Sequence, residues 1–90
     1  MARKKQPANV VGTEIQKHRN NLGLTQEQFA TKCQLHGLNI SRGTVSQIEA
    51  QLRCVIDSEL FLLASILGVS TESLYSADFK ASLRKNKIQK

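Results

Sequence analysis

The chain has 90 residues, a single Pro and many helix formers, which predicts one small all-α domain, and no apolar run approaches the roughly 20 residues of a membrane-spanning helix. The formal net charge is +6, but the body from Val10 to Phe79 holds five bases against seven acids, a net charge of −2. The basicity therefore lies in the two tails, which suits a polyanionic partner or, alternatively, only keeps disordered ends solvated.

Cysteine and histidine usage argues against a metal site and against catalysis. Cys33 and Cys54 have no C-x-x-C spacing, and His18 and His36 stand apart from them, so neither a zinc site nor any other cofactor is expected. One disulfide is an alternative, but the lack of a signal peptide favours reduced thiols and a cytoplasmic location. Since no nucleophile has a His at motif spacing and no Gly-rich phosphate loop occurs, we do not expect an enzyme.

Residues 1–9 are polar, basic and without periodicity, and they predict a flexible arm. A helix from Val10 to Asn21 follows, closed by Gly23. Its apolar face is expected to comprise Val11, Ile15, His18 and Leu22.

The sequence predicts two successive helix starts in the middle of the chain, near Thr25 and Ser41. Thr25 and Gln28 have the spacing of a capping box, and Leu24 and Phe29 have that of a hydrophobic staple. Ser41 repeats this pattern, with apolar residues one before it and four after it. The segment between these helices, from Leu35 to Ile40, contains Gly37 and should pack Leu38 and Ile40 on the core. The second helix should bury Phe29, Ala30 and Cys33.

The helix that begins near Ser41 has two unlike faces. Val45, Ile48 and Leu52 form a narrow apolar stripe. The opposite face carries no acid and mostly small side chains: Arg42, Gly43, Ser46, Gln47 and Ala50. Arg can pair with guanine and Gln with adenine in the major groove, and small neighbours let a helix approach base edges. An ordinary solvated helix face is the alternative.

Arg19 and Glu49 both fall on apolar stripes. A charge on a buried face needs a partner, so the sequence predicts an ion pair between the first and third helices.

The last third of the chain is the most apolar. Asp57 is the expected cap of a fourth helix, with Ile56 and Phe61 as its staple, and Gly68 closes it. A short fifth helix should follow between residues 69 and 74, and the segment to Leu83 either continues as a helix or packs across a two-fold axis. More apolar residues lie here than one small core needs, which predicts a contact surface for a second copy: Phe61, Leu62, Tyr75 and Phe79.

Three segments together resemble the helix-turn-helix of the lambdoid phage repressor and Cro family, also called the xenobiotic-response-element family: LGLTQEQFA at 22–30, ISRGTVSQIE at 40–49 and LGVSTESLY at 67–75. The resemblance implies a compact five-helix, lambda-repressor-like domain over residues 10–76, between the basic arm 1–9 and a basic tail 77–90. The chain departs from the family pattern in two places. The inter-helix segment is longer than the usual turn, and Ala50 and Gln51 stand where a Gly usually closes the recognition helix.

This resemblance implies a regulator of transcription, most often a repressor, that binds a double-stranded DNA operator as a homodimer. Base contacts would come from Arg42, Gly43, Ser46 and Gln47. Phosphate contacts would come from Gln26, Thr44, Arg53, Arg3, Lys4 and Lys5. The family also buries an Arg–Glu pair at positions matching Arg19 and Glu49. The alternative is a protein-interaction module, such as an antitoxin or a coactivator with the same fold, which the net charge of −2 on the body favours.

Overall fold

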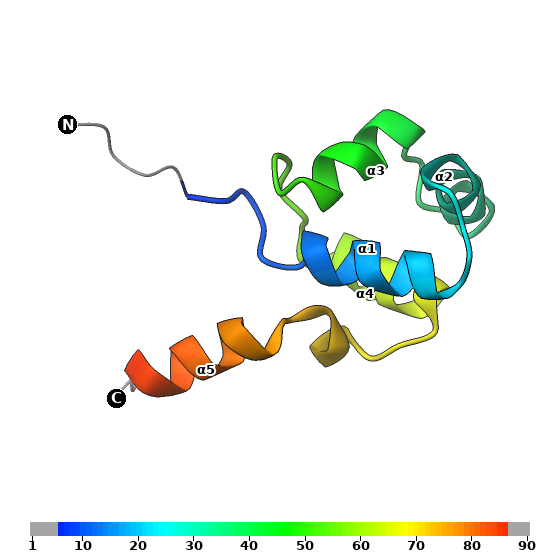
Figure 1. Cartoon of the computed structure of the whole chain (residues 1–90). Helices are drawn as coiled ribbons and strands as arrows, with labels where there is room; N and C mark the ends of the chain where they lie inside the picture. The colour runs from blue at the N-terminus through cyan, green and yellow to red at the C-terminus, as the bar shows by residue number, and fades with distance from the viewer. Residues whose placement is uncertain (1–5, 87–90) are drawn as a thin grey trace.

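The computed structural model describes residues 6–86, and within them it contains helices and no strand. The helices are α1 (Gly12–Asn21), α2 (Gln26–Leu35), α3 (Arg42–Glu49), α4 (Asp57–Leu67), the 3₁₀ helix η1 (Thr71–Leu74) and α5 (Ala77–Asn86). The predicted all-α fold with five helices is confirmed. In Figure 1, α2 and α3 stand together at one end of the domain, α1 and α4 lie beneath them, and α5 projects at the other end. Arg3, Lys4 and Lys5 lie outside the described residues.

One apolar core joins α1 to α4 and η1. Its largest fully buried side chains are those of Phe29, Ile15, Leu63, Leu74, Val45 and Cys33. Leu22, expected on the buried face of the first helix, is 48% exposed, because it occupies the C-cap position of α1, where the chain turns away.

The start of α1 differs from the prediction. Asn9 is buried, and its Oδ1 accepts hydrogen bonds from the backbone N–H groups of Val11 (3.0 Å) and Gly12 (2.8 Å). Asn9 thus satisfies N–H groups that the first turn leaves free, so α1 begins at Gly12 rather than Val10. The predicted boundary of the arm 1–9 is therefore wrong, since Asn9 belongs to the folded domain.

The predicted helix starts at Thr25 and Ser41 are present. Thr25 Oγ1 accepts from Gln28 N–H at 3.0 Å, and Gln28 Oε1 accepts from Thr25 N–H at 2.9 Å, which completes the capping box. Ser41 Oγ accepts from Thr44 N–H at 3.2 Å. Between α2 and α3 the chain turns at Gly37, and the side chains of Leu38 and Ile40 are buried in the core as predicted.

The end of α3 also differs. The helix stops at Glu49, and Gln51 takes a left-handed backbone conformation with φ 63°. This is the conformation that favours glycine, and it occurs where the family usually has one. The chain then turns away from the helix axis. Leu52, predicted on the apolar stripe of this helix, therefore lies outside the helix and is 72% exposed.

The start of α4 is shifted by one residue from the prediction. Ile56, not Asp57, holds the N-cap position, and its backbone N–H donates to Glu59 Oε1 at 3.2 Å. Val55 and Leu60 consequently take the staple positions against the core. The expected staple residues Ile56 and Phe61 face outward and are 58% and 63% exposed. Gly68 closes the helix at φ 75°, as predicted.

The chain ends in a helix, one of the two outcomes expected for this segment. Ser70 caps η1 by accepting from Ser73 N–H at 3.3 Å. After η1, the ring of Tyr75 stacks on that of Phe79 with their centroids 5.6 Å apart, and α5 begins at Ala77. Unlike the other helices, α5 is not packed extensively on the domain.

Candidate nucleic-acid interface

The exposed face of α3 is free of acids. Arg42, Gly43, Ser46 and Gln47 are exposed on it, together with Ala50 at its end. The only acid of α3, Glu49, is buried on the other side, so no carboxylate would oppose a DNA backbone at this face. The structure thus brings the four predicted base-contacting residues together on one accessible surface.

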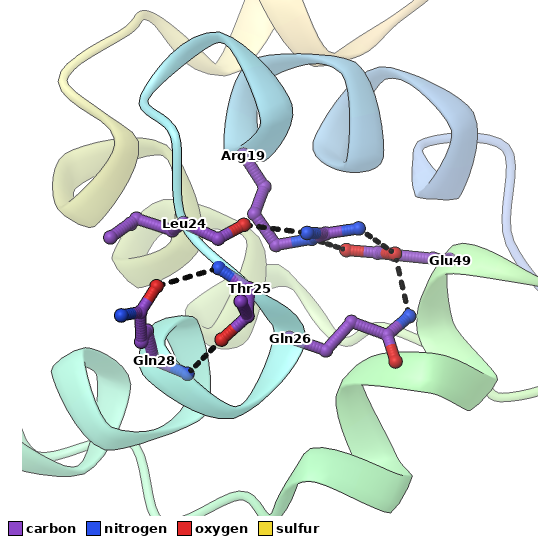
Figure 2. Close-up of polar contacts among 6 residues, drawn as sticks. All are labelled: Arg19, Leu24, Thr25, Gln26, Gln28 and Glu49. Atoms are coloured by element: carbon purple, nitrogen blue, oxygen red, sulfur yellow. Dashed lines mark hydrogen bonds and ion pairs between the residues drawn. The ribbon is translucent and has the colours of Figure 1, made fainter.

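The predicted ion pair between Arg19 and Glu49 forms, and it fixes α3 on α1 (Figure 2). Arg19 Nε donates to Glu49 Oε2 at 2.6 Å, and Nη2 donates to Oε1 at 3.0 Å. Nη1 donates to the carbonyl oxygen of Leu24 at 2.7 Å. Because Leu24 precedes α2, this single guanidinium holds the end of α1, the start of α2 and the end of α3 together.

Gln26 is attached to the same carboxylate. Its Nε2 donates to Glu49 Oε1 at 3.0 Å, as Figure 2 shows. An amide nitrogen carries two hydrogens, so one remains for a further acceptor. Gln26 is the first residue of α2, and the amino end of a helix favours anions. Glu49 therefore orients the side chain predicted to contact phosphate, while Arg19 compensates the charge of Glu49.

Two further predicted phosphate contacts lie within the described residues, Thr44 and Arg53, and both are placed less favourably. Arg53 makes two hydrogen bonds to Glu59, from Nη1 at 3.0 Å and from Nη2 at 2.9 Å. These bonds lower the pKa of Glu59 and raise that of Arg53. The charge of Arg53 is thus already balanced by α4, a pairing that the sequence analysis missed. Thr44 is half-buried, with its Oγ1 at 3.3 Å from Ser41 Oγ.

The segment before α1 is tied to the end of α3. Asn9 Nδ2 donates to the carbonyl oxygens of Ile48 (3.1 Å) and Arg53 (2.8 Å). Ala8 N–H donates to Gln51 O at 2.9 Å, and Gln51 Nε2 donates to Asn9 O at 3.0 Å. Ala8 and Asn9 therefore lie beside the end of α3. The signal for Asn9 was present in the sequence, since Asn is a favoured cap just before an apolar periodic segment.

The described residues can also be compared with the requirements of a metal site and of a reactive thiol. No group of three or more His, Cys, Asp or Glu side chains there could hold a metal ion. Both cysteines are free, and burial raises the pKa of the Cys33 thiol to about 11, which makes it a poor nucleophile. No helix in this part of the chain is long and apolar enough to cross a membrane.

Comparison with known proteins agrees with this geometry. A family model described as helix-turn-helix matches residues 15–74, which includes α2, the turn and α3. The chain belongs to the helix-turn-helix family. It is of the xenobiotic-response-element type, as the resemblance of the three segments implied, and members of this type are DNA-binding regulators.

A solved structure supports the fold of this helix-turn-helix protein. The chain is similar to the crystal structure of a hypothetical transcription factor, NHTF, from Neisseria, with a TM-score of 0.66 and 22% sequence identity. The match covers 92% of this chain and 94% of the other. At this identity the likeness shows the fold alone. No curated protein matches the chain.

Proposed function

We propose that this helix-turn-helix protein is a sequence-specific regulator of transcription, a repressor, that binds its operator as a homodimer with α3 in the major groove. The observation that carries the proposal is the exposed, acid-free face of α3, held on the domain by the Arg19–Glu49 pair. Such a protein would act in the cytoplasm.

The roles within the interface follow from side-chain chemistry. Arg42 and Gln47 present the donors and acceptors that read guanine and adenine. Gly43 and Ser46 are small, so they let the helix approach the base edges closely. Gln26, oriented by Glu49, would donate to a phosphate and so fix the docking of α3. The hydroxyl of Thr44 would contact the DNA backbone. Arg53 would contact a phosphate only if its guanidinium bound the phosphate and Glu59 together.

A dimer is part of the proposal because one recognition helix reads few base pairs. Two copies related by a two-fold axis place two helices in successive major grooves, on half-sites about one DNA turn apart. Their combined contacts raise the ratio of specific to non-specific binding.

Selection of bound duplexes from a random pool tests binding and specificity together. We expect a palindromic consensus sequence. On that sequence, Arg42→Ala should cost about 1–3 kcal/mol at one base position and relax the preference there. Gln26→Ala should instead weaken specific and non-specific duplexes by the same factor. The direct-readout role of Arg42 fails if its replacement also lowers both affinities equally.

Repression needs its own measurement. A reporter gene placed behind the selected operator should be expressed less when the protein is present, and Arg42→Ala should relieve this effect. An increase in expression would leave the DNA-binding proposal intact and replace repression with activation.

A protein-interaction module is the second candidate. It is favoured by the net charge of −2 between Val10 and Phe79 and by the neutralisation of Arg53 by Glu59. An antitoxin or coactivator of this kind would show no consensus in the selection and would bind mixed duplexes weakly.

A further inference from the structure

The connection between α2 and α3 is longer than the turn of an ordinary helix-turn-helix. Six residues, from His36 to Ser41, separate the two helices, whereas such motifs usually have a turn of roughly three or four. The proposed interface uses residues of α2, of α3 and of the loop after α3, and it gives the extra residues no role. No Asp or Glu occurs between Gln28 and Ile48, so the connection carries no acid that would oppose a phosphate.

The connection is anchored on the domain at both sides of Asn39. Leu38 and Ile40 are buried in the core, and Leu38 N–H donates to the carbonyl oxygen of Cys33 at 2.9 Å. Gln34 Nε2 donates to Ile40 O at 2.7 Å. Ile40 N–H donates to Leu38 O at 2.9 Å, which closes a three-residue turn with Asn39 at its apex. Asn39 is therefore held between two anchored neighbours, and its side chain is exposed.

Asn39 also lies close to the amino end of α3. It precedes Arg42 by three residues, which span at most about 11 Å. A recognition helix enters the major groove with its amino end, and the groove is about 12 Å wide. When Arg42 reads a base, Asn39 is thus within reach of the phosphates that border the groove. An Asn amide carries two N–H donors, which phosphate oxygens accept.

We propose that Asn39 donates a hydrogen bond to a DNA phosphate beside the amino end of α3. Gln26 is attached to the other end of this helix through Glu49, the last residue of α3. Because α3 has eight residues and is only about 12 Å long, the two amides would hold it on the DNA backbone near both of its ends. The longer connection would thus supply a second anchor for the docking of α3.

The inference deepens the proposed function and rests on it for its role, because it names a further contact that fixes α3 in the groove. The side chain of Asn39 is uncharged, so this contact differs from those of the basic arm. Its loss should lower the affinity for DNA without changing the slope of log affinity against log salt concentration.

A charge series at this position tests the contact. Asn39→Ala should weaken binding to specific and mixed-sequence duplexes alike, by about threefold to tenfold, because a phosphate contact carries no sequence information. Asn39→Asp should weaken both more strongly, since its carboxylate would face a phosphate. Denaturant titration verifies that each variant is as stable as the natural chain.

Thr71→Asp is the matched control for the added charge. Thr71 is exposed on η1, a helix that packs on α1 and α4. The same charge placed there should weaken binding several-fold less than Asn39→Asp does. Equal losses from the two variants would show only the change in net charge and would overturn the contact.

Uncharged phosphates in the duplex locate the contact. Methylphosphonates replace the phosphates one at a time, and each replacement removes a charge and an acceptor oxygen. We expect one phosphate in each half-site whose replacement weakens binding of the natural chain but not of Asn39→Ala. It should differ from the phosphate that is coupled in this way to Gln26→Ala, because the two amides lie near opposite ends of α3. If no phosphate is coupled to Asn39, the inference is overturned.

The choice of duplex separates this inference from the proposed function. A protein that selects one operator, and binds it unchanged after Asn39→Ala and Asn39→Asp, would overturn the contact and leave the regulator intact. A protein that prefers no sequence, yet loses affinity with Asn39→Asp and not with Thr71→Asp, would support the phosphate contact and refute the sequence-specific regulator.

Discussion

Arg19 on α1 and Glu49 on α3 meet through hydrogen bonds of 2.6 and 3.0 Å, and both side chains are buried. A pair of this kind adds less net stability than its geometry suggests, because both charges lose their hydration. Its value lies in fixing one arrangement of neighbouring elements. Here the same carboxylate also accepts from Gln26, so the position of α3 and the orientation of a predicted phosphate contact depend on one group.

The first prediction follows from this pair. Arg19→Ala should lower the free energy of unfolding by about 3–5 kcal/mol, because Glu49 remains buried without its partner. The matched control is Lys17→Ala, on the exposed side of the same helix, which should change it by less than about 0.5 kcal/mol. Denaturant titration measures both. Equal stability of the two variants would contradict the buried pair.

The second prediction concerns Gln51, which holds the left-handed position after α3 at φ 63°. Gln51→Gly relieves the backbone strain but loses the hydrogen bond to Asn9 O, whereas Gln51→Ala loses the bond and keeps the strain. We expect the Gly variant to be about 1–2 kcal/mol more stable than the Ala variant. The natural chain should exceed the Ala variant by roughly 0.5–1.5 kcal/mol, the net contribution of the bond. Identical melting temperatures for the Gly and Ala variants would show that the position is unstrained.

The starts of α2 and α3 and the ion pair were predictable from the sequence because their signals are local. Thr25 and Ser41 are strong caps, and Arg19 and Glu49 stand out as charges on apolar stripes. The end of α3 was not predictable in the same way. No Gly marks it, and the hydrogen bonds that Gln51 makes with Ala8 and Asn9 in its left-handed conformation are tertiary contacts that the local sequence does not indicate. The misplacement of Leu52 follows from this one residue.

The fourth helix shows a different limit. Asp57 is a good cap by type, but the helix starts one residue earlier because Val55 and Leu60 pack on the core. Because the helix start differs by one position, Ile56 and Phe61, expected as the hydrophobic staple, are exposed. The pairing of Arg53 with Glu59 joins a loop to a helix and has no periodicity, so only the structure reveals it.

The third prediction is a pH dependence. Hydrogen bonds from Arg53 hold the pKa of Glu59 below its ordinary value. A carboxyl whose pKa is lowered by folding stabilises the fold at pH values above the ordinary pKa, about 4.3, and loses that stabilisation as the pH falls through the folded value. Glu59→Gln should therefore be less stable than the natural chain at pH 7. The difference should shrink in acid, below about pH 4.

Thermal melts from pH 2 to pH 7 test this dependence. Glu27→Gln, at an exposed acid in the first turn of α2, is the control for removal of a carboxylate near a helix start. A Glu59→Gln difference that stays constant across this range would show that the bonds to Arg53 do not stabilise the fold through the carboxylate charge.

The last prediction concerns the basic arm. Since the body from Val10 to Phe79 carries a net charge of −2, most long-range attraction to DNA must come from the tails. Ala8 and Asn9 anchor the start of the described chain beside the end of α3, so Arg3, Lys4 and Lys5 are only a few residues from the proposed interface. Each phosphate neutralised adds roughly 0.9 to the slope of log affinity against log salt concentration. Replacing these three bases with Gln should therefore flatten the slope by up to about 2–3 and weaken binding at low salt.

Base preference at the positions read by Arg42 and Gln47 should survive this change, because the α3 surface is untouched. Truncation after Asn86 removes two positive charges at the other end, Lys87 and Lys90, against the three of the arm, and leaves α5 in place. We expect a smaller change in slope from the truncation, since α5, as far as the structure describes it, is not packed extensively on α3. A salt titration of operator binding compares the three proteins. An unchanged slope after the Gln replacements would refute the role of the arm and would favour the protein-interaction module over the DNA-binding regulator.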